Sequence, residues 1–260
     1  MPLSVATWNV NGIRAREEQF LDWIGRDRPD ILCLQEIKAS PEKLSERLCE
    51  LGDYWCAWHG EGGYSGVALH LRRERFPEQP DFHHPPFDHE CRIVAADLGE
   101  LVIASIYVPN GGKDFDAQLR FLQALRAWAV ALASQDRAVL LCGDLNVARS
   151  DADVHPSLMK KKPMIGTLPE ERELLEGILK AGFVDVGREL EPQNQRLFTW
   201  WAPWRNLRQR NIGWRIDYVL ASAGLFETVR ECRVLSDVGT SDHAPVVAVF
   251  EGEPGAATRG

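Results

Sequence analysis

The 260-residue sequence has no long apolar run and no cysteine motif. No segment approaches the roughly 18 to 20 consecutive apolar residues that a helix needs to cross a bilayer. The first residues, MPLSVATWNV, lack the basic start and apolar stretch of a secretory signal. The six cysteines stand singly, without a CxxC pair, which argues against zinc or redox motifs and favours reduced thiols. We therefore expect a cytoplasmic protein without a membrane partner.

Several enzyme motifs are also missing. There is no Walker loop, no HExxH and no GxSxG, since GYSGV has the wrong spacing, so nucleotide-triphosphate hydrolysis, zinc-peptidase chemistry and serine-hydrolase chemistry are disfavoured. The segment 83–91, HHPPFDHEC, contains three histidines and could be read as a zinc site. Its prolines, and the lack of matching ligands elsewhere, favour a surface loop instead.

The chain does contain enough apolar residues, 45%, for one large core. We expect a single catalytic domain over residues 1–251 and a frayed tail over 252–260. Apolar and branched runs predict strands at 4–8, 30–35, 67–71, 92–98, 101–108, 138–144, 215–221 and 246–250. Helices are predicted at 15–26, 41–51, 114–134 and 169–181. Several strands are apolar on nearly every residue, which is typical of strands covered on both faces, so an α/β sandwich with outer helices is predicted.

The net charge of −8 argues against a general coat of nucleic acid, but the charge is unevenly distributed. Residues 196–216 contain five arginines, four tryptophans and no acidic residue. A solvated basic loop is the plain alternative, yet exposed aromatic side chains are costly unless they contact something. Lys160–Lys162 form a second positive spot, equally consistent with a DNA contact or a solvated loop.

Polar residues recur where the predicted strands end. Six tips carry them: Asn9, Glu36, Tyr107 with Asn110, Asp144 with Asn146, Asp217, and Asp242 with His243. One such residue is ordinary turn chemistry, but six indicate a site built on loops that a rigid sheet holds. Oxygen donors without thiols favour Mg²⁺ or Mn²⁺. A metal, a water and a histidine beside carboxylates suit hydrolysis of a phosphate ester.

The motifs themselves resemble a known family. WNVNGIRAR, LQEIKA, GYSGVAL, IYVPNGG, GDLNVA, LPEER, GWRIDYVLAS and TSDHAPV stand in the order seen in exonuclease III-type apurinic/apyrimidinic endonucleases, of the endonuclease/exonuclease/phosphatase superfamily, over residues 3–250. The resemblance implies a four-layered αββα sandwich of two packed mixed sheets flanked by helices. It also implies a monomeric, metal-dependent phosphodiesterase of base excision repair. Such an enzyme hydrolyses double-stranded DNA 5′ to abasic sites, leaves a 3′-hydroxyl, and also has 3′-exonuclease and 3′-phosphatase activities on blocked 3′ ends.

The resemblance further implies roles for single residues. Glu36 corresponds to the principal metal ligand, with Asp242 and Asn9 close to the same ion. His243 corresponds to the group that contacts the scissile phosphate, oriented by Asp217. The remaining catalytic candidates are Asp144, which positions or deprotonates the attacking water, Asn146 beside it, and the phenol of Tyr107. A carboxylate beside an imidazole favours the charged imidazolium, which can hydrogen-bond a developing phosphorane.

A third set is expected to bind DNA: Arg14, Gly63, Tyr64, Asn110, Trp200, Arg208, Trp214 and Ile216. Trp200, Trp214 and Ile216 match positions that pocket the flipped-out abasic sugar, although many relatives carry Phe in place of Trp200. The others match positions that contact the DNA backbone. We expect Trp201 and Trp204 to be structural.

Two other functions remain open on sequence grounds. One is a phosphatase of a small phosphorylated molecule or lipid, which would not need an extended stripe of arginine and tryptophan. The other is a DNA-binding module without catalysis, which the complete set of acids and His243 disfavours.

Overall fold

The computed structural model describes residues 1–159 and 162–252. The strands are β1 (Leu3–Asn9), β2 (Ile31–Gln35), β3 (Tyr54–Glu61), β4 (Tyr64–Arg72), β5 (Asp81–His83), β6 (Ile93–Asp97), β7 (Leu101–Tyr107), β8 (Ala138–Asp144), β9 (Phe183–Asp185), β10 (Asp217–Ser222), β11 (Val229–Val234) and β12 (Val246–Phe250). The α-helices are α1 (Glu17–Asp27), α2 (Glu46–Cys49), α3 (Phe115–Ala133), α4 (Pro169–Leu179), α5 (Val186–Leu190) and α6 (Ala223–Phe226). Short 3₁₀ turns are η1 (Ile13–Arg16), η2 (Pro41–Lys43), η3 (Asp151–Asp153) and η4 (Pro156–Leu158). Lys160, Lys161 and the predicted tail from 253 onward lie outside the described residues.

The strands form two six-stranded mixed sheets with related topology. Their orders are β11-β12-β1-β2-β4-β3 and β5-β6-β7-β8-β10-β9. Each sheet has one central parallel pair, β1 with β2 and β7 with β8, and its other pairs are antiparallel. Parallel neighbours require a crossover, and α1 and α3 supply it.

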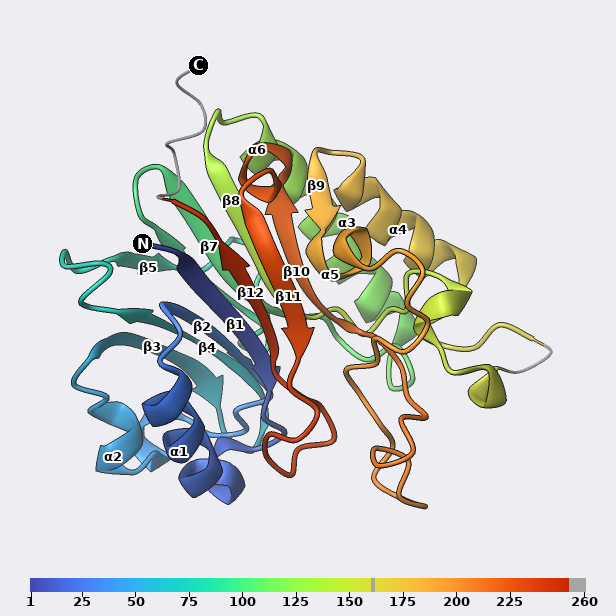
Figure 1. The fold of residues 1–260 in the computed structure, drawn as a ribbon, viewed down its shortest axis with the longest axis horizontal. Helices are drawn as coiled ribbons and strands as arrows, with labels where there is room; N and C mark the ends of the chain where they lie inside the picture. The colour runs from blue at the N-terminus through green and yellow to red at the C-terminus, as the bar shows by residue number, and fades with distance from the viewer. Residues whose placement is uncertain (160–161, 253–260) are drawn as a thin grey trace.

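The layers follow from which face of each strand is apolar. One buried cluster joins the inner faces of both sheets, for example Val5 and Cys33 with Ile103 and Cys142. A second packs α3 and α4 on the outer face of one sheet, and a third packs α1 on the outer face of the other. Figure 1 shows α1 and α2 on one side of the paired sheets and α3 and α4 on the other. The predicted αββα sandwich is therefore confirmed.

The differences from the predicted elements have local causes. The expected helix at 41–51 is broken into η2 and the four-residue α2, because Leu44 is extended between them. Strand β3 was missed because most of its residues are half-buried on a sheet edge, which gives no continuous apolar run. Among the described helices, none has the length and apolarity needed to span a bilayer.

The predicted start of α4 is confirmed and has a use in the site. Pro169 opens the helix, and the Glu171 carboxylate accepts hydrogen bonds from the backbone N–H groups of Gly166 at 2.9 Å and Leu168 at 2.8 Å. A carboxylate that caps the start of a helix holds the preceding backbone in place. It fixes the loop at 164–166, which forms one wall of the cavity described below.

Candidate active site

The polar strand tips meet at one rim of the sandwich. The parallel pairs bring the ends of β1 and β2 together, as well as those of β7 and β8, so Asn9 lies near Glu36 and Tyr107 near Asp144. Asp217 opens β10 directly opposite Asp144 in the antiparallel register. The convergence expected from sequence is observed for these residues.

Asn9 links the two sheets at this rim. It is fully buried, and its side-chain amide donates to Glu36 Oε1 at 2.9 Å and to Asp144 Oδ2 at 2.9 Å. Lys38 Nζ lies 2.6 Å from the other Glu36 oxygen. Burial would raise the pKa of Glu36, but the bonds from Asn9 and Lys38 outweigh it and hold that pKa below its usual value. Glu36 is thus an ionised carboxylate at the rim.

His243 is held as a cation. Its Nδ1–H donates to Asp217 Oδ2 at 2.9 Å, and its Nε2 lies 3.8 Å from Asp144 Oδ2. Burial by itself lowers the pKa of His243, but the charges of Asp217 and Asp144 outweigh it and raise the pKa to about 10. The imidazole is therefore charged at neutral pH, as expected from the adjacent carboxylates.

Thr199 orients Asp217, the partner of the His243 cation, and the sequence analysis did not identify this role. Its hydroxyl donates to Asp217 Oδ2 at 2.6 Å and accepts the backbone N–H groups of Ile216 and Asp217, both at 3.1 Å. Thr199 is 1% exposed. A threonine between apolar neighbours in LFTWW was the available signal, since a buried hydroxyl needs a partner.

Asp144 is the most perturbed acid at the rim. Burial raises its pKa, and the charges of Asp217 and Glu36 raise it further against the opposing effect of His243, to about 8. Its Oδ1 accepts the backbone N–H of Asn146 at 2.9 Å, and Asn146 in turn donates its amide to Val108 O at 2.8 Å. This carboxyl can gain or lose a proton near neutral pH while its position is fixed.

Asp242 is anchored from both sides. Asn11 donates to its Oδ1 at 2.8 Å and the indole Nε1 of Trp200 to its Oδ2 at 2.9 Å. Burial opposes ionisation, but the charge of His243 and these hydrogen bonds keep the pKa of Asp242 below its usual value. The Trp200 indole therefore connects the cavity wall to a candidate metal ligand.

The rim has the donor chemistry of a divalent-cation site. Glu36, Asp144 and His243 each offer an atom within 4.8 Å of the others. The carboxylates offer oxygen ligands, and they outnumber the basic side chains of His243 and Lys38. Excess buried negative charge of this kind suits a hard cation. Asp242 lies outside that closest group, so its part as a ligand remains a prediction.

An open cavity of about 510 Å³ adjoins these polar groups. Its apolar side is formed by Met164, Ile165, Gly166, Trp200, Trp214 and Ile216. Single β-bridges join Trp200 to both Trp214 and His243, so the apolar wall is attached directly to the charged centre. Sequence reasoning named the last three residues and missed 164–166, for which proximity to LPEER was the only signal.

The remaining predicted DNA contacts have varied surroundings. Arg14, Gly63, Tyr64 and Asn110 are exposed. Asn110 donates to Asn146 Oδ1 at 3.3 Å and so lies on the cavity rim. The Tyr64 ring lies 4.3 Å from the Lys113 ammonium, and its hydroxyl accepts from Arg92 at 3.0 Å. Their contacts with DNA remain predictions.

Arg208 is directed inward. Its guanidinium donates to the backbone carbonyls of Ser236 at 2.8 Å and Val238 at 2.9 Å, and also to that of Ser241. It also lies over the ring of Trp201, 5.1 Å from the centroid. Arg208 thus braces the loop that leads to Asp242, and direct contact with DNA remains a prediction.

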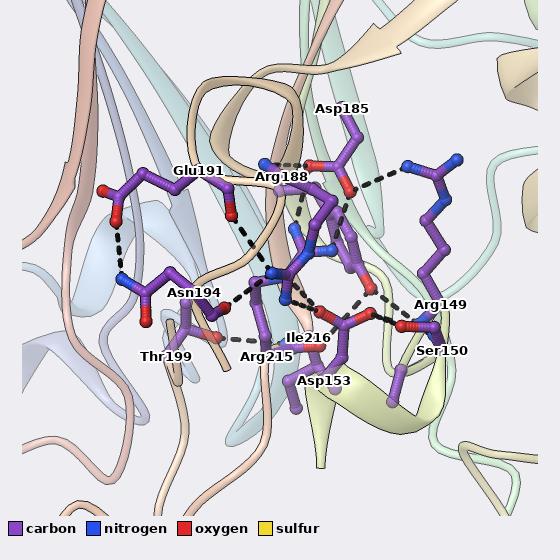
Figure 2. Close-up of polar contacts among 12 residues, drawn as sticks. Arg149, Ser150, Asp153, Asp185, Arg188, Glu191, Asn194, Thr199, Arg215 and Ile216 are labelled. Atoms are coloured by element: carbon purple, nitrogen blue, oxygen red, sulfur yellow. Dashed lines mark hydrogen bonds and ion pairs between the residues drawn. The ribbon is translucent and has the colours of Figure 1, made fainter. Parts of the chain in front are cut away.

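The arginines and tryptophans of the basic segment 196–216 differ in how far they are buried. Arg215 is buried and pairs with Asp153 and Asp185, as Figure 2 shows. The prediction for Trp201 is confirmed, since it is 2% exposed and donates to Asn211. The prediction for Trp204 is wrong: it is 60% exposed, within the run of turns over residues 203–211. The exposed cations of the segment are Arg196, Arg205 and Arg210.

Comparisons with known proteins agree with this geometry. The model of the Endonuclease/Exonuclease/phosphatase family matches residues 6–243. The chain is 32% identical to the DNA repair nuclease APEX1 of Danio rerio over 94% of this chain and 81% of that protein, and 33% identical to an exodeoxyribonuclease of Bacillus subtilis over 95% and 99%. An AP endonuclease structure from Archaeoglobus fulgidus is 30% identical, with a TM-score of 0.84 over 96% of this chain and 100% of that one.

Proposed function

The chain belongs to the Endonuclease/Exonuclease/phosphatase family, and we propose that it is a DNA-repair nuclease that hydrolyses the backbone 5′ to abasic sites and leaves a 3′-hydroxyl. The observation that carries this is the meeting of a charged His243, a perturbed Asp144 and an apolar cavity at one rim. The relatives with DNA repair and exodeoxyribonuclease names support DNA as the substrate. The same centre would remove 3′ nucleotides and 3′ phosphates, since all three reactions hydrolyse a phosphate ester.

In the proposed mechanism, water attacks the phosphorus directly, without a covalent enzyme intermediate. Asp144 holds this water and accepts its proton, for which its raised pKa is suited. His243 Nε2–H, not used by Asp217, donates to a non-bridging phosphate oxygen, where charge develops. Tyr107 and Asn146, which line the same cavity, contact the phosphate.

We propose Mg²⁺, or Mn²⁺ in its place, as the cofactor. Glu36 would hold the ion, with Asp242 and Asn9 beside it, because these are oxygen donors at a rim with excess negative charge. When bound, the ion would neutralise charge on the phosphate oxygens.

The apolar wall supports abasic specificity. A flipped-out sugar without its base presents little that needs a hydrogen bond, and Trp214 and Ile216 can cover it. A nucleotide carrying a base would bring polar edges against this wall, which is costly without partners, so 3′ nucleotides should be removed more slowly than abasic sites are cleaved. The exposed Trp204, Arg205 and Arg210 favour a long DNA ligand over a small phosphorylated headgroup.

The test is a nicking assay with two duplexes. One carries a single abasic analogue, and the other is undamaged with a recessed 3′ end. We expect Mg²⁺-dependent cleavage of the first, abolished by EDTA and lowered about 10²-fold or more in His243→Ala. Exposed His89 provides the control variant, His89→Ala, with unchanged cleavage. No metal-dependent nick in the abasic duplex would refute the proposal.

A further inference from the structure

A second cluster of ligating side chains lies outside the candidate active site. His59 lies on β3, the edge strand of one sheet. His84 and Asp88 lie in the segment after β5, the edge strand of the other sheet. The sequence suggested that HHPPFDHEC had no matching ligand elsewhere, and the fold supplies one from 25 positions upstream of His84.

The three donor groups already face one another. His59 Nε2 lies 2.6 Å from Asp88 Oδ2, and the rings of His59 and His84 stack with centroids 3.7 Å apart. One ligand atom from each residue lies within 4.8 Å of the others. A tetrahedral ion with bonds of about 2.0 to 2.1 Å requires ligand atoms roughly 3.3 Å apart. His59 Nε2 and Asp88 Oδ2, now hydrogen-bonded, would therefore move slightly apart, and exposed His84 would turn toward them.

Neighbouring backbone groups orient two of the ligands as metal sites require. His84 Nδ1 pairs with the carbonyl of Ile93 at 2.8 Å, which leaves its Nε2 free. Asp88 Oδ1 accepts the N–H groups of Arg92 at 2.8 Å and Ile93 at 2.9 Å, which leaves Oδ2 for the cluster. A histidine fixed through its other nitrogen and a carboxylate fixed through its other oxygen are typical of bound metal ions.

The composition of the cluster selects the ion. Two imidazoles and one carboxylate favour Zn²⁺ over Mg²⁺, and exposed His84 leaves room for a water as fourth ligand.

We propose that His59, His84 and Asp88 form a Zn²⁺ site that links the edge strand β3 of one sheet to the loop after edge strand β5 of the other. The ion would stabilise the folded state, since the three ligands meet only there. The ion would also help to fix the position of Tyr64, because the Arg92 backbone N–H donates to Asp88 and the Arg92 guanidinium donates to the Tyr64 hydroxyl.

The experiment measures binding, so it does not depend on the proposed nuclease activity. Protein stripped with EDTA is titrated with Zn²⁺ against a coloured chelator in excess Mg²⁺, and with Co²⁺, whose visible spectrum reports tetrahedral nitrogen and oxygen ligands. We expect one equivalent bound, a tetrahedral Co²⁺ spectrum, and a Tm increase of roughly 5 °C at saturating Zn²⁺.

Variants identify the site. His59→Ala and His84→Ala should each lose this equivalent and the Tm increase, while His89→Ala, in the same segment, should keep both. Circular dichroism confirms that each variant is folded. Equal binding in all variants, or loss of the equivalent only in Glu36→Gln, would overturn the proposal and assign the ion to the active centre. No binding to the folded wild type would overturn it as well.

Discussion

Two buried charge clusters lie on either side of residues 215–217, and they behave in opposite ways. Toward the cavity, Asp217 and Asp144 share the single imidazole of His243. Away from it, Arg215 pairs with two carboxylates: its Nε lies 2.6 Å from Asp153, and its two terminal nitrogens lie 2.8 and 2.7 Å from Asp185 (Figure 2). Both clusters consist of buried acids and cations.

The difference lies in charge balance. In the second cluster, Arg188 also pairs with Asp153 at 2.6 Å, so every acid faces a guanidinium. Although burial opposes ionisation, these cations hold the pKa of Asp153 down to about 2, whereas burial and neighbouring acids raise the pKa of Asp144 to about 8. A buried cluster whose acidic and basic side chains balance stabilises the fold. A cluster with excess acid that opens on a cavity is instead available for catalysis.

The largest expected effect is on turnover. Asp144→Asn should lower turnover in Mg²⁺ about 10²- to 10⁴-fold, because the proton acceptor is lost. The variant should unfold in EDTA at no lower temperature than the wild type, since a destabilising buried charge is removed. Steady-state cleavage and calorimetry at pH 8 check both. If Asp144→Asn lost as much stability as Arg215→Leu in the other cluster, the two clusters would not differ in role.

Breaking the balanced cluster should instead unfold the protein. Arg215→Leu leaves Asp153 and Asp185 without their central cation and should lower the free energy of unfolding by about 3 kcal/mol or more. Urea denaturation measures it, with Arg205→Leu in an exposed turn as control. A loss below about 1 kcal/mol, typical of surface pairs, would show that the cluster does not stabilise the fold.

Acid should weaken the same cluster. The pKa of Asp153 is lowered in the folded state to about 2, whereas in the unfolded chain it is near 4. Ionised Asp153 therefore adds about 2 kcal/mol to the free energy of unfolding above pH 4, and this stabilisation is lost as the pH falls toward 2. Urea midpoints between pH 5 and 2 should fall less steeply in Asp153→Asn than in the wild type. Parallel curves would contradict this assignment.

The smallest effect concerns Thr199, which lies between the clusters and orients Asp217. Thr199→Val removes the hydroxyl that donates to Asp217 and accepts the N–H groups of Ile216 and Asp217. Loss of the bond to the Asp217 carboxylate, worth about 1 kcal/mol, should lower turnover about fivefold. Thr199→Ser keeps the hydroxyl and should restore turnover. If both variants lose activity equally, the methyl group matters rather than the hydrogen bond.

Much of this molecule follows from its sequence alone. Runs such as VLLC and VVAVF predicted buried strands because apolar patterns report burial directly. The polar tips predicted a shared rim, because parallel strands place their ends together. The family motifs, which lie at those tips, carried the αββα fold as well.

Only the tertiary structure decided which partner each polar side chain meets. Arg215 lies in a basic segment yet is buried against Asp153, 62 positions away, while Trp204 in the same segment is exposed. His59 on β3 of one sheet meets Asp88 in the loop between β5 and β6 of the other, and no local pattern relates them. The physical reason is that periodicity records whether a side chain is buried. A hydrogen bond or ion pair depends on distances between strands that are remote along the chain.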